Sequence, residues 1–171
     1  QKNLSGAISR VTENNQSVSF DHIAIIERKN NGVNVLEASI KNGSSKTPYK
    51  EFIKNHNDAK VILYRLKPQF QYAIPDALLK ANSMLGKPYN ISYILNEDSY
   101  YCSDFIERSF RNATVFELKP MTFINPKTGK TDTYWQSFYD TLGLNVPEGK
   151  MGCNPNGLSH SEKIEKIKVL N

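Results

Sequence analysis

One cysteine stands where a helix would begin. Cys102 lies in the stretch SYYCSDFIERSF, residues 99–110, whose apolar residues recur at helical spacing. A thiol acts as a nucleophile only as the thiolate, and a helix N-terminus with a neighbouring imidazolium lowers the thiol pKa from about 8.5 toward neutrality. Cys102 can therefore be a nucleophile, a packed small hydrophobe, or one half of a disulfide with Cys153.

A histidine and a glutamate could complete this chemistry. His22 and Glu37 lie fifteen positions apart, in SFDHIAII and VLEAS, two β-branched runs that the sequence NNG joins as a hairpin. On adjacent strands the Glu37 carboxylate would reach the His22 imidazole and fix its orientation and tautomer. This pairing also explains an acidic residue in the middle of a strand that otherwise looks buried.

Each of these residues also has a plainer interpretation. A single inward-facing histidine such as His22 is often a satisfied core residue. His56 and His160 occupy polar, loop-like stretches and are predicted to be surface residues. Ser103 lacks the G-x-S-x-G turn of a serine nucleophile. The cysteine, the histidine and the glutamate together favour thiol chemistry more strongly than any of them alone.

Helices and short strands must position these side chains, and the chain shows no internal repeat or low-complexity segment. The pattern predicts helices in NLSGAISRVTENN, YKEFIKNHN, the segment from Pro75 to Gly86, and YCSDFIERSFRNA. It predicts strands in SVSFDHIAIIERK, GVNVLEASI and AKVILYRLK, with KNGSSKTP as a turn-rich connection. The apolar residues Ile164, Ile167 and Val169 fit either a last strand or an amphipathic turn.

The composition, 171 residues with 39% hydrophobic and 23% charged, is that of a globular protein. We expect one domain over residues 1–171, in which residues 114–171 form a C-terminal extension.

A net charge of +5 comes from scattered basic residues, so no nucleic-acid surface is predicted. No apolar run approaches the ~18 residues of a membrane span. Two cysteines without CxxC spacing predict no metal site, and no cofactor is expected.

Five sequence blocks, taken in their order, resemble the YiiX/YebB-like branch of the NlpC/P60 superfamily, the circularly permuted papain-like hydrolases. The blocks are SFDHIAII, VLEAS, YRL, LGKPYN and YYCSDFIERSF. The resemblance runs from about Leu4 to Ala113. It implies an α+β fold in which an antiparallel sheet packs against the helix that carries the nucleophile. By this resemblance Cys102 is the nucleophile, His22 the base and Glu37 the orienting polar residue. Permutation accounts for a histidine strand that precedes the cysteine helix.

Two features depart from the family pattern. Members usually carry a Gly-Asp-rich strand of the GDLLF type before the segment that matches NLSGAISRVT, and the numbered chain lacks it, because it was removed or lies outside the numbering. The sequence after Ala113 has no usable match and is interpreted as a cap over the cleft. Tyr101 and Tyr89 are candidate substrate-binding residues of that cleft, although both can also be ordinary core aromatics.

The resemblance implies a cysteine peptidase or amidase that cleaves amide bonds in small peptides or cell-wall (murein) peptides through a thioester. The alternatives are a thiol acyltransferase or lipid acyl hydrolase, which an apolar trench beside Cys102 would indicate, and a catalytically silent binding domain. The chain begins at Gln1 without a Met, and relatives are often exported. We therefore expect an extracytoplasmic bacterial protein, periplasmic, secreted or lipoprotein-anchored, with association to the membrane or envelope left open.

Overall fold

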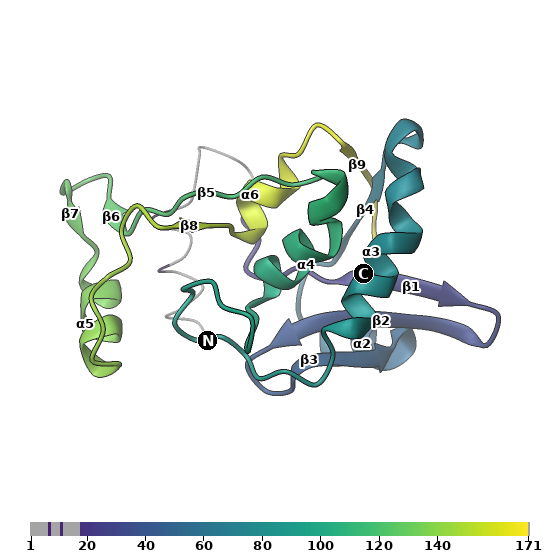
Figure 1. The fold of residues 1–171 in the computed structure, drawn as a ribbon, viewed down its shortest axis with the longest axis horizontal. Helices are drawn as coiled ribbons and strands as arrows, with labels where there is room; N and C mark the ends of the chain where they lie inside the picture. Colours follow the sequence, from purple (N-terminus) through teal and green to yellow (C-terminus); the bar gives the residue numbers. More distant parts are fainter. Residues whose placement is uncertain (1–6, 8–10, 12–17, 171) are drawn as a thin grey trace.

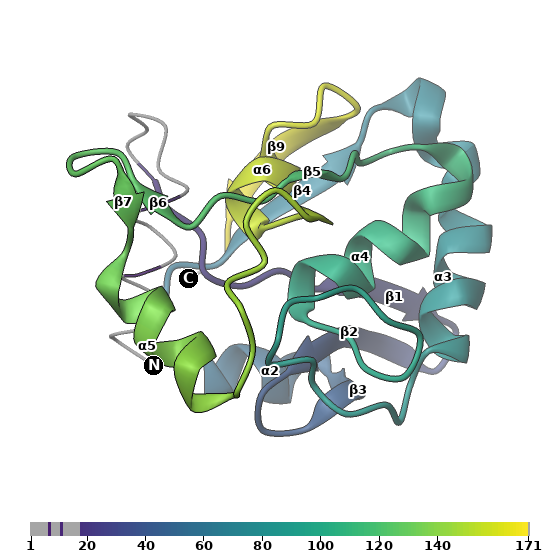
Figure 2. The same ribbon diagram turned by 60° about the vertical axis from the view of Figure 1, so that its left-hand side comes forward.

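The computed structural model describes residues 7, 11 and 18–170. The helix predicted in NLSGAISRVTENN lies outside these described residues except at Ala7 and Val11, which are both helical. Figures 1 and 2 show how the elements are arranged. In chain order they are β1 (Ile25–Lys29), β2 (Gly32–Ser39), β3 (Gly43–Pro48), α2 (Tyr49–Asn55), β4 (Ile62–Leu66), the 3-10 helix η1 (Pro68–Ala73), α3 (Ile74–Ser83), α4 (Cys102–Phe110), the 3-10 helix η2 (Arg111–Ala113), β5 (Lys119–Pro120), β6 (Ile124–Asn125), β7 (Lys130–Thr131), α5 (Thr133–Thr141), β8 (Met151–Gly152), α6 (Pro155–Ser159) and β9 (Ile164–Val169).

β1, β2 and β3 form an antiparallel sheet in that order, and the predicted NNG turn joins the first two strands. β3 corrects the sequence prediction, because GSSKTP is a strand paired with β2 and not a turn-rich connection. The sequence of β3, GSSKTP, has small hydroxyl side chains and no alternation of apolar residues, so the pattern does not predict a strand. The buried Ser44 makes hydrogen bonds in place of apolar contacts, donating to the carbonyl oxygens of Met84 and Lys87 at 2.6 and 3.2 Å.

The strand at His22 is shorter than predicted. The hydrogen-bonded ladder of β1 begins at Ile25, opposite Leu36, so His22 precedes the strand. Beyond that point β2 continues to Ser39 in a pairing with β3. His22 has no partner in the backbone ladder between β1 and β2. Its side chain contacts the side chain of Glu37, and this contact brings the two residues together.

Helix α4 runs through the centre of the molecule, and every one of its residues is buried. Its apolar residues Phe105 and Ile106 belong to the main core, with side chains of β2 and α3. Arg108 of the same helix contacts Asp104 and Glu97, each at 2.6 Å. Because a buried charge without a partner is costly, these pairs let the helix be enclosed on all sides.

The other predicted elements close around this core. α2, β4 and α3 lie where the sequence predicts them, and α3 begins at Ile74 and Pro75. β9 resolves the ambiguity at the C-terminal end, since Ile164–Val169 is a strand that pairs antiparallel with β4. The sequence after Ala113 therefore contributes a strand beside β4 as well as further elements around the site.

A second group of elements has its own apolar centre. The β6–β7 hairpin and α5 surround Phe123, Trp135 and Tyr139, and β5 pairs with β8 at the base of the group. We call residues 119–152 the aromatic lobe. Figure 1 places it at the opposite end of the molecule from α3. Of the helices in the described part of the chain, none is both long and apolar enough to cross a membrane.

Candidate active site

Helix α4 begins at Cys102 because the chain before it is extended. Tyr101 has φ −95° and ψ 166°, and its carbonyl oxygen accepts a hydrogen bond from the Phe105 N–H at 2.9 Å. The N-cap side chain makes no capping hydrogen bond. The first backbone N–H groups, and with them the positive end of the helix dipole, therefore act on the surroundings of the Cys102 sulfur.

His22 and Glu37 make a short polar contact beside this helix end. Nε2 of His22 lies 2.5 Å from Oε2 of Glu37, and 29% of the imidazole is exposed against 8% of the carboxylate. Burial alone would lower the pKa of His22, but hydrogen bonds with Cys102 and Glu37, and their negative charges, raise that pKa from 6.5 to about 10. At neutral pH His22 is therefore an imidazolium.

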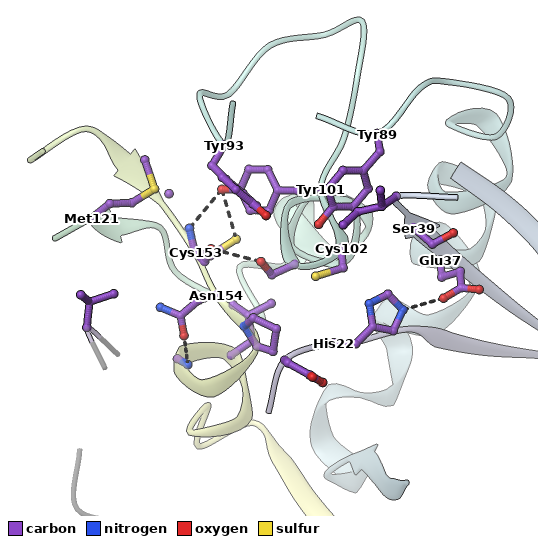
Figure 3. A pocket seen from close by; sticks show the side chains of 18 of the residues that line it. His22, Glu37, Ser39, Tyr89, Tyr93, Tyr101, Cys102, Met121, Cys153 and Asn154 are labelled. Atoms are coloured by element: carbon purple, nitrogen blue, oxygen red, sulfur yellow. Dashed lines mark hydrogen bonds and ion pairs between the residues drawn. The ribbon is translucent and has the colours of Figure 1, made fainter. Parts of the chain in front are cut away.

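The cysteine, the histidine and the glutamate meet where the sequence predicts. Figure 3 shows the Cys102 sulfur on one side of the His22 ring and Glu37 on the other. Because Nε2 is bonded to Glu37, Nδ1 is the nitrogen that faces the sulfur. Cys102 and Cys153 are both free thiols, so the disulfide alternative is wrong. A thiol beside an imidazolium that a carboxylate orients is suited to nucleophilic catalysis.

Both predicted tyrosines lie at this site. Tyr101 is 2% exposed, and its hydroxyl accepts a hydrogen bond from the Cys153 backbone N–H at 3.3 Å. Tyr89 comes from the segment before α4 and lines the cavity close to Cys102. Burial and the negative charge of Cys102 raise the pKa of Tyr89, so its O–H stays protonated. Tyr101 packs in the wall of the cavity, whereas Tyr89 lies beside Cys102.

His56 is closer to the site than the sequence predicts. Its ring is nearly parallel to that of His22, with 6.3 Å between centroids and 8° between planes. Its Nδ1 lies 2.8 Å from the carbonyl oxygen of Phe52, which is in the middle of α2. The polar neighbours of His56 in the sequence suggested a surface loop. In the structure His56 follows α2, and its ring lies beside that of His22. His160 is exposed, as predicted, although it also borders the cavity.

Tyr93 is a site residue that the sequence prediction missed. It lines the cavity and has a left-handed backbone with φ 56°. The sequence PYNISY held a usable signal. An Asn two positions before a Ser forms a tight side-chain turn, here with Ser92 N–H donating to Asn90 Oδ1 at 3.1 Å, and such turns bring flanking residues such as Tyr89 and Tyr93 together.

The site opens into a cavity of about 1150 Å³. Its lining is mixed. The segment before β1, α2 and the loop after α2 contribute polar side chains: Asp21, Glu51, Asn55, His56 and Asp58. The aromatic lobe contributes apolar side chains: Met121, Phe123 and Trp135. The space is large enough for a substrate that extends in both directions from Cys102.

The sequence matches the family described as "Permuted papain-like amidase enzyme, YaeF/YiiX, C92 family" over residues 2–168. The chain belongs to this family. It is therefore an enzyme of the papain-like cysteine amidase class, and the resemblance noted between about Leu4 and Ala113 extends over almost the whole sequence. The wider grouping with NlpC/P60 enzymes stays a prediction. Among curated proteins, none matches the chain.

A solved structure supports the fold of the family. The crystal structure of the metalloprotein yiiX from Escherichia coli O157:H7 is similar, with a TM-score of 0.74 and 23% sequence identity, over 96% of this chain and 89% of that one. This similarity confirms the predicted permuted papain-like fold. In the described part of the present chain, no three His, Cys, Asp or Glu side chains are grouped to hold a metal ion.

Proposed function

We propose that Cys102 is the nucleophile of this amidase, His22 its acid and base, and Glu37 the group that orients His22. The observation that carries the proposal is the position of His22, bonded through Nε2 to Glu37 with Nδ1 turned to the Cys102 sulfur. The imidazolium and the helix N-terminus both favour the thiolate over the thiol.

The reaction is acyl transfer from an amide to water. The Cys102 thiolate adds to the carbonyl carbon, and Nδ1 of His22 gives its proton to the leaving nitrogen as the C–N bond breaks. A thioester remains on Cys102. Neutral His22 then takes a proton from water while the water oxygen adds to the thioester, and the C–S bond breaks. The acid leaves, and the thiolate and imidazolium are restored.

Two donors suit the oxyanion that forms in each half of this reaction. One is the backbone N–H of Cys102 at the open end of α4, and the other is the hydroxyl of Tyr89, which lines the same cavity. The raised pKa of Tyr89 keeps its proton in place for donation. Donors that are fixed before the charge develops stabilise it without reorganisation.

The substrate we propose is an amide in a small peptide or a cell-wall peptide, met outside the cytoplasm. Support comes from carboxylates that line the cavity, contributed by Asp21, Glu51 and Asp58. A peptide amino group would find opposite charge there. A thiol acyltransferase or lipid acyl hydrolase would instead use the apolar side formed by the aromatic lobe.

A panel of chromogenic substrates tests this proposal. Aminoacyl and dipeptidyl p-nitroanilides should release p-nitroaniline, and Cys102→Ala should abolish the release, whereas Cys153→Ala, which removes the other thiol, should retain it. Long-chain p-nitrophenyl esters should react no faster than p-nitrophenyl acetate. Hydrolysis that survives in Cys102→Ala would contradict the proposed nucleophile. Turnover confined to the long-chain esters would favour the lipid alternative.

A further inference from the structure

The backbone at His22 lies outside the hydrogen-bonded sheet. The ladder between β1 and β2 begins at Ile25, opposite Leu36, so the sheet does not fix the chain before that point. The contact with Glu37 is made by side chains and holds the His22 ring. A base acts on a thiol only within hydrogen-bond reach of it. Other contacts must therefore hold the backbone that carries His22.

Asn156 of α6 supplies such a contact. The Phe20 backbone N–H, two residues before His22, donates a hydrogen bond to Oδ1 of Asn156 at 2.6 Å. A backbone N–H can only donate, so the amide oxygen of Asn156 is the atom that faces it. Asn156 is 6% exposed, and its Nδ2 donates to the Ser19 hydroxyl at 3.5 Å. The Phe20 ring also makes an edge contact with the Tyr64 ring of β4, with 6.1 Å between centroids.

The chain just before α6 is bonded to both neighbours of the nucleophile. The Cys153 N–H donates to the Tyr101 hydroxyl at 3.3 Å, and the Ser103 hydroxyl donates to the Cys153 carbonyl oxygen at 3.1 Å. Tyr101 and Ser103 flank Cys102 in the sequence, and both are buried. Figure 3 shows Cys153 beside Tyr101. Residues 153–156 therefore connect the start of α4 with the segment before β1.

We propose that Asn156 is a positioning residue that holds His22 beside Cys102, an inference that rests on the proposed function. Its neighbours Pro155 and Gly157 line the cavity, whereas Asn156 is not among the described residues that do. Its side chain therefore acts on the backbone before His22 and not on the substrate. The hydrogen bond joins residues 136 positions apart, so the C-terminal part of the chain helps to hold the catalytic base.

The pH dependence of Cys102 alkylation by iodoacetamide tests this role. An ordinary thiol with a pKa near about 8.5 reacts slowly at about pH 6, because it is almost entirely protonated there, and fast at about pH 9. The ratio of the two rates therefore reports the thiolate that the His22 imidazolium maintains. In wild type we expect similar rates at the two pH values. Far-UV circular dichroism at both values identifies the variants that are folded.

Asn156→Leu keeps the approximate shape of the side chain and removes the acceptor, so we expect it to lower the alkylation ratio about tenfold. Asn156→Ala is the second variant, in case the apolar side chain prevents folding, and should change the ratio in the same direction. Asn156→Asp keeps an oxygen for the Phe20 N–H and should restore most of the wild-type ratio. Ser159→Ala is the matched control. The Ser159 hydroxyl donates to the Asn156 carbonyl oxygen at 2.7 Å, so its loss disturbs α6 but leaves the Asn156 side chain in place and should not change the ratio.

Three results would overturn the proposal. They are a wild-type ratio in the folded Asn156→Leu or Asn156→Ala variant, a ratio in Asn156→Asp as low as in Asn156→Leu, and an equally low ratio in Ser159→Ala. Failure of the proposed function looks different, because wild type itself would then show the low ratio of an ordinary thiol.

Discussion

The charge on His22 decides whether Cys102 can act. The imidazole is partly buried, which opposes a positive charge, yet Cys102 and Glu37 outweigh this effect and raise the His22 pKa to about 10. A pair of opposite charges at neutral pH differs from a neutral thiol and a neutral ring in one practical respect. In such a pair the nucleophile would be formed before the substrate arrives, and the proton for the leaving group would already be in place.

Removing the charge of Glu37 should lower the pKa of His22. Glu37→Gln keeps the length of the side chain and an oxygen that can accept from Nε2, but it loses the negative charge. We expect the His22 pKa to fall from about 10 by ~1–2 units. Nuclear magnetic resonance titration of the ring nitrogens measures this directly, with the exposed Glu162→Gln as control. An unchanged titration in Glu37→Gln would contradict the assigned role.

The same variant has a predicted effect on stability. Because the folded-state pKa of His22 lies above its unfolded value of 6.5, its contribution is fully present below pH 6.5 and is lost as the pH rises through about 10. Urea denaturation across this range should show a smaller loss for Glu37→Gln than for wild type. Parallel losses in the two proteins would mean that the carboxylate does not support the imidazolium.

At the scale of elements, the sequence predicts best where one local pattern decides the structure. Periodic apolar residues predict α4, and NNG predicts the β1–β2 turn; together these place Cys102, His22 and Glu37 correctly. β3 could not be predicted in this way, because its order depends on pairing with β2 and on hydrogen bonds to a distant segment. The position of the Tyr93 ring at the cavity escaped prediction because it depends on long-range contacts with Tyr101 and Trp135.

Gly43 is the point at which β3 supports the segment that carries Tyr89. Its φ is +60°, and a Cβ there would lie 2.2 Å from the Lys87 carbonyl oxygen. That oxygen accepts a hydrogen bond from the Ser44 N–H at 2.8 Å, so the two segments cannot separate freely. β3 therefore sets the position of the chain just before Tyr89.

Gly43→Ala should lower the free energy of unfolding by about 2–3 kcal/mol, measured by urea denaturation. Gly129→Ala is the matched control, because Gly129 also has a positive φ of +66° but open space around it, and it should cost about 1 kcal/mol. Gly43→Ala should also slow acylation by p-nitrophenyl acetate, since Tyr89 shifts. Equal losses of stability in the two variants would show that the close approach at Lys87 has no energetic weight.

At the scale of the whole molecule, the site depends on segments that are far apart in sequence. His22, Cys102 and Trp135 all border one cavity, and no local pattern predicts that the aromatic lobe would form one side of it. The lobe has an apolar centre separate from the main core. Tyr93 joins the two through its edge contacts with Tyr101 and Trp135.

This arrangement supports the prediction of a single domain, which unfolding can test. Trp135 is the one tryptophan of the chain and is 3% exposed within the lobe, so its fluorescence reports on that part of the molecule. Far-UV circular dichroism reports on all elements. We expect both signals to change at the same urea concentration, as in a cooperative unit. A fluorescence transition at lower urea would mean that the lobe unfolds as a separate domain.

The central claim is that Cys102 and His22 form a thiolate–imidazolium pair. Its most direct test is the rate of Cys102 alkylation by iodoacetamide as a function of pH, with the modified residue located by mass spectrometry, in wild type and in His22→Ala. We predict a rate that stays high below pH 7 in wild type and collapses there in His22→Ala. A wild-type rate that follows an ordinary thiol with a pKa near about 8.5, unchanged by the substitution, would contradict the claim.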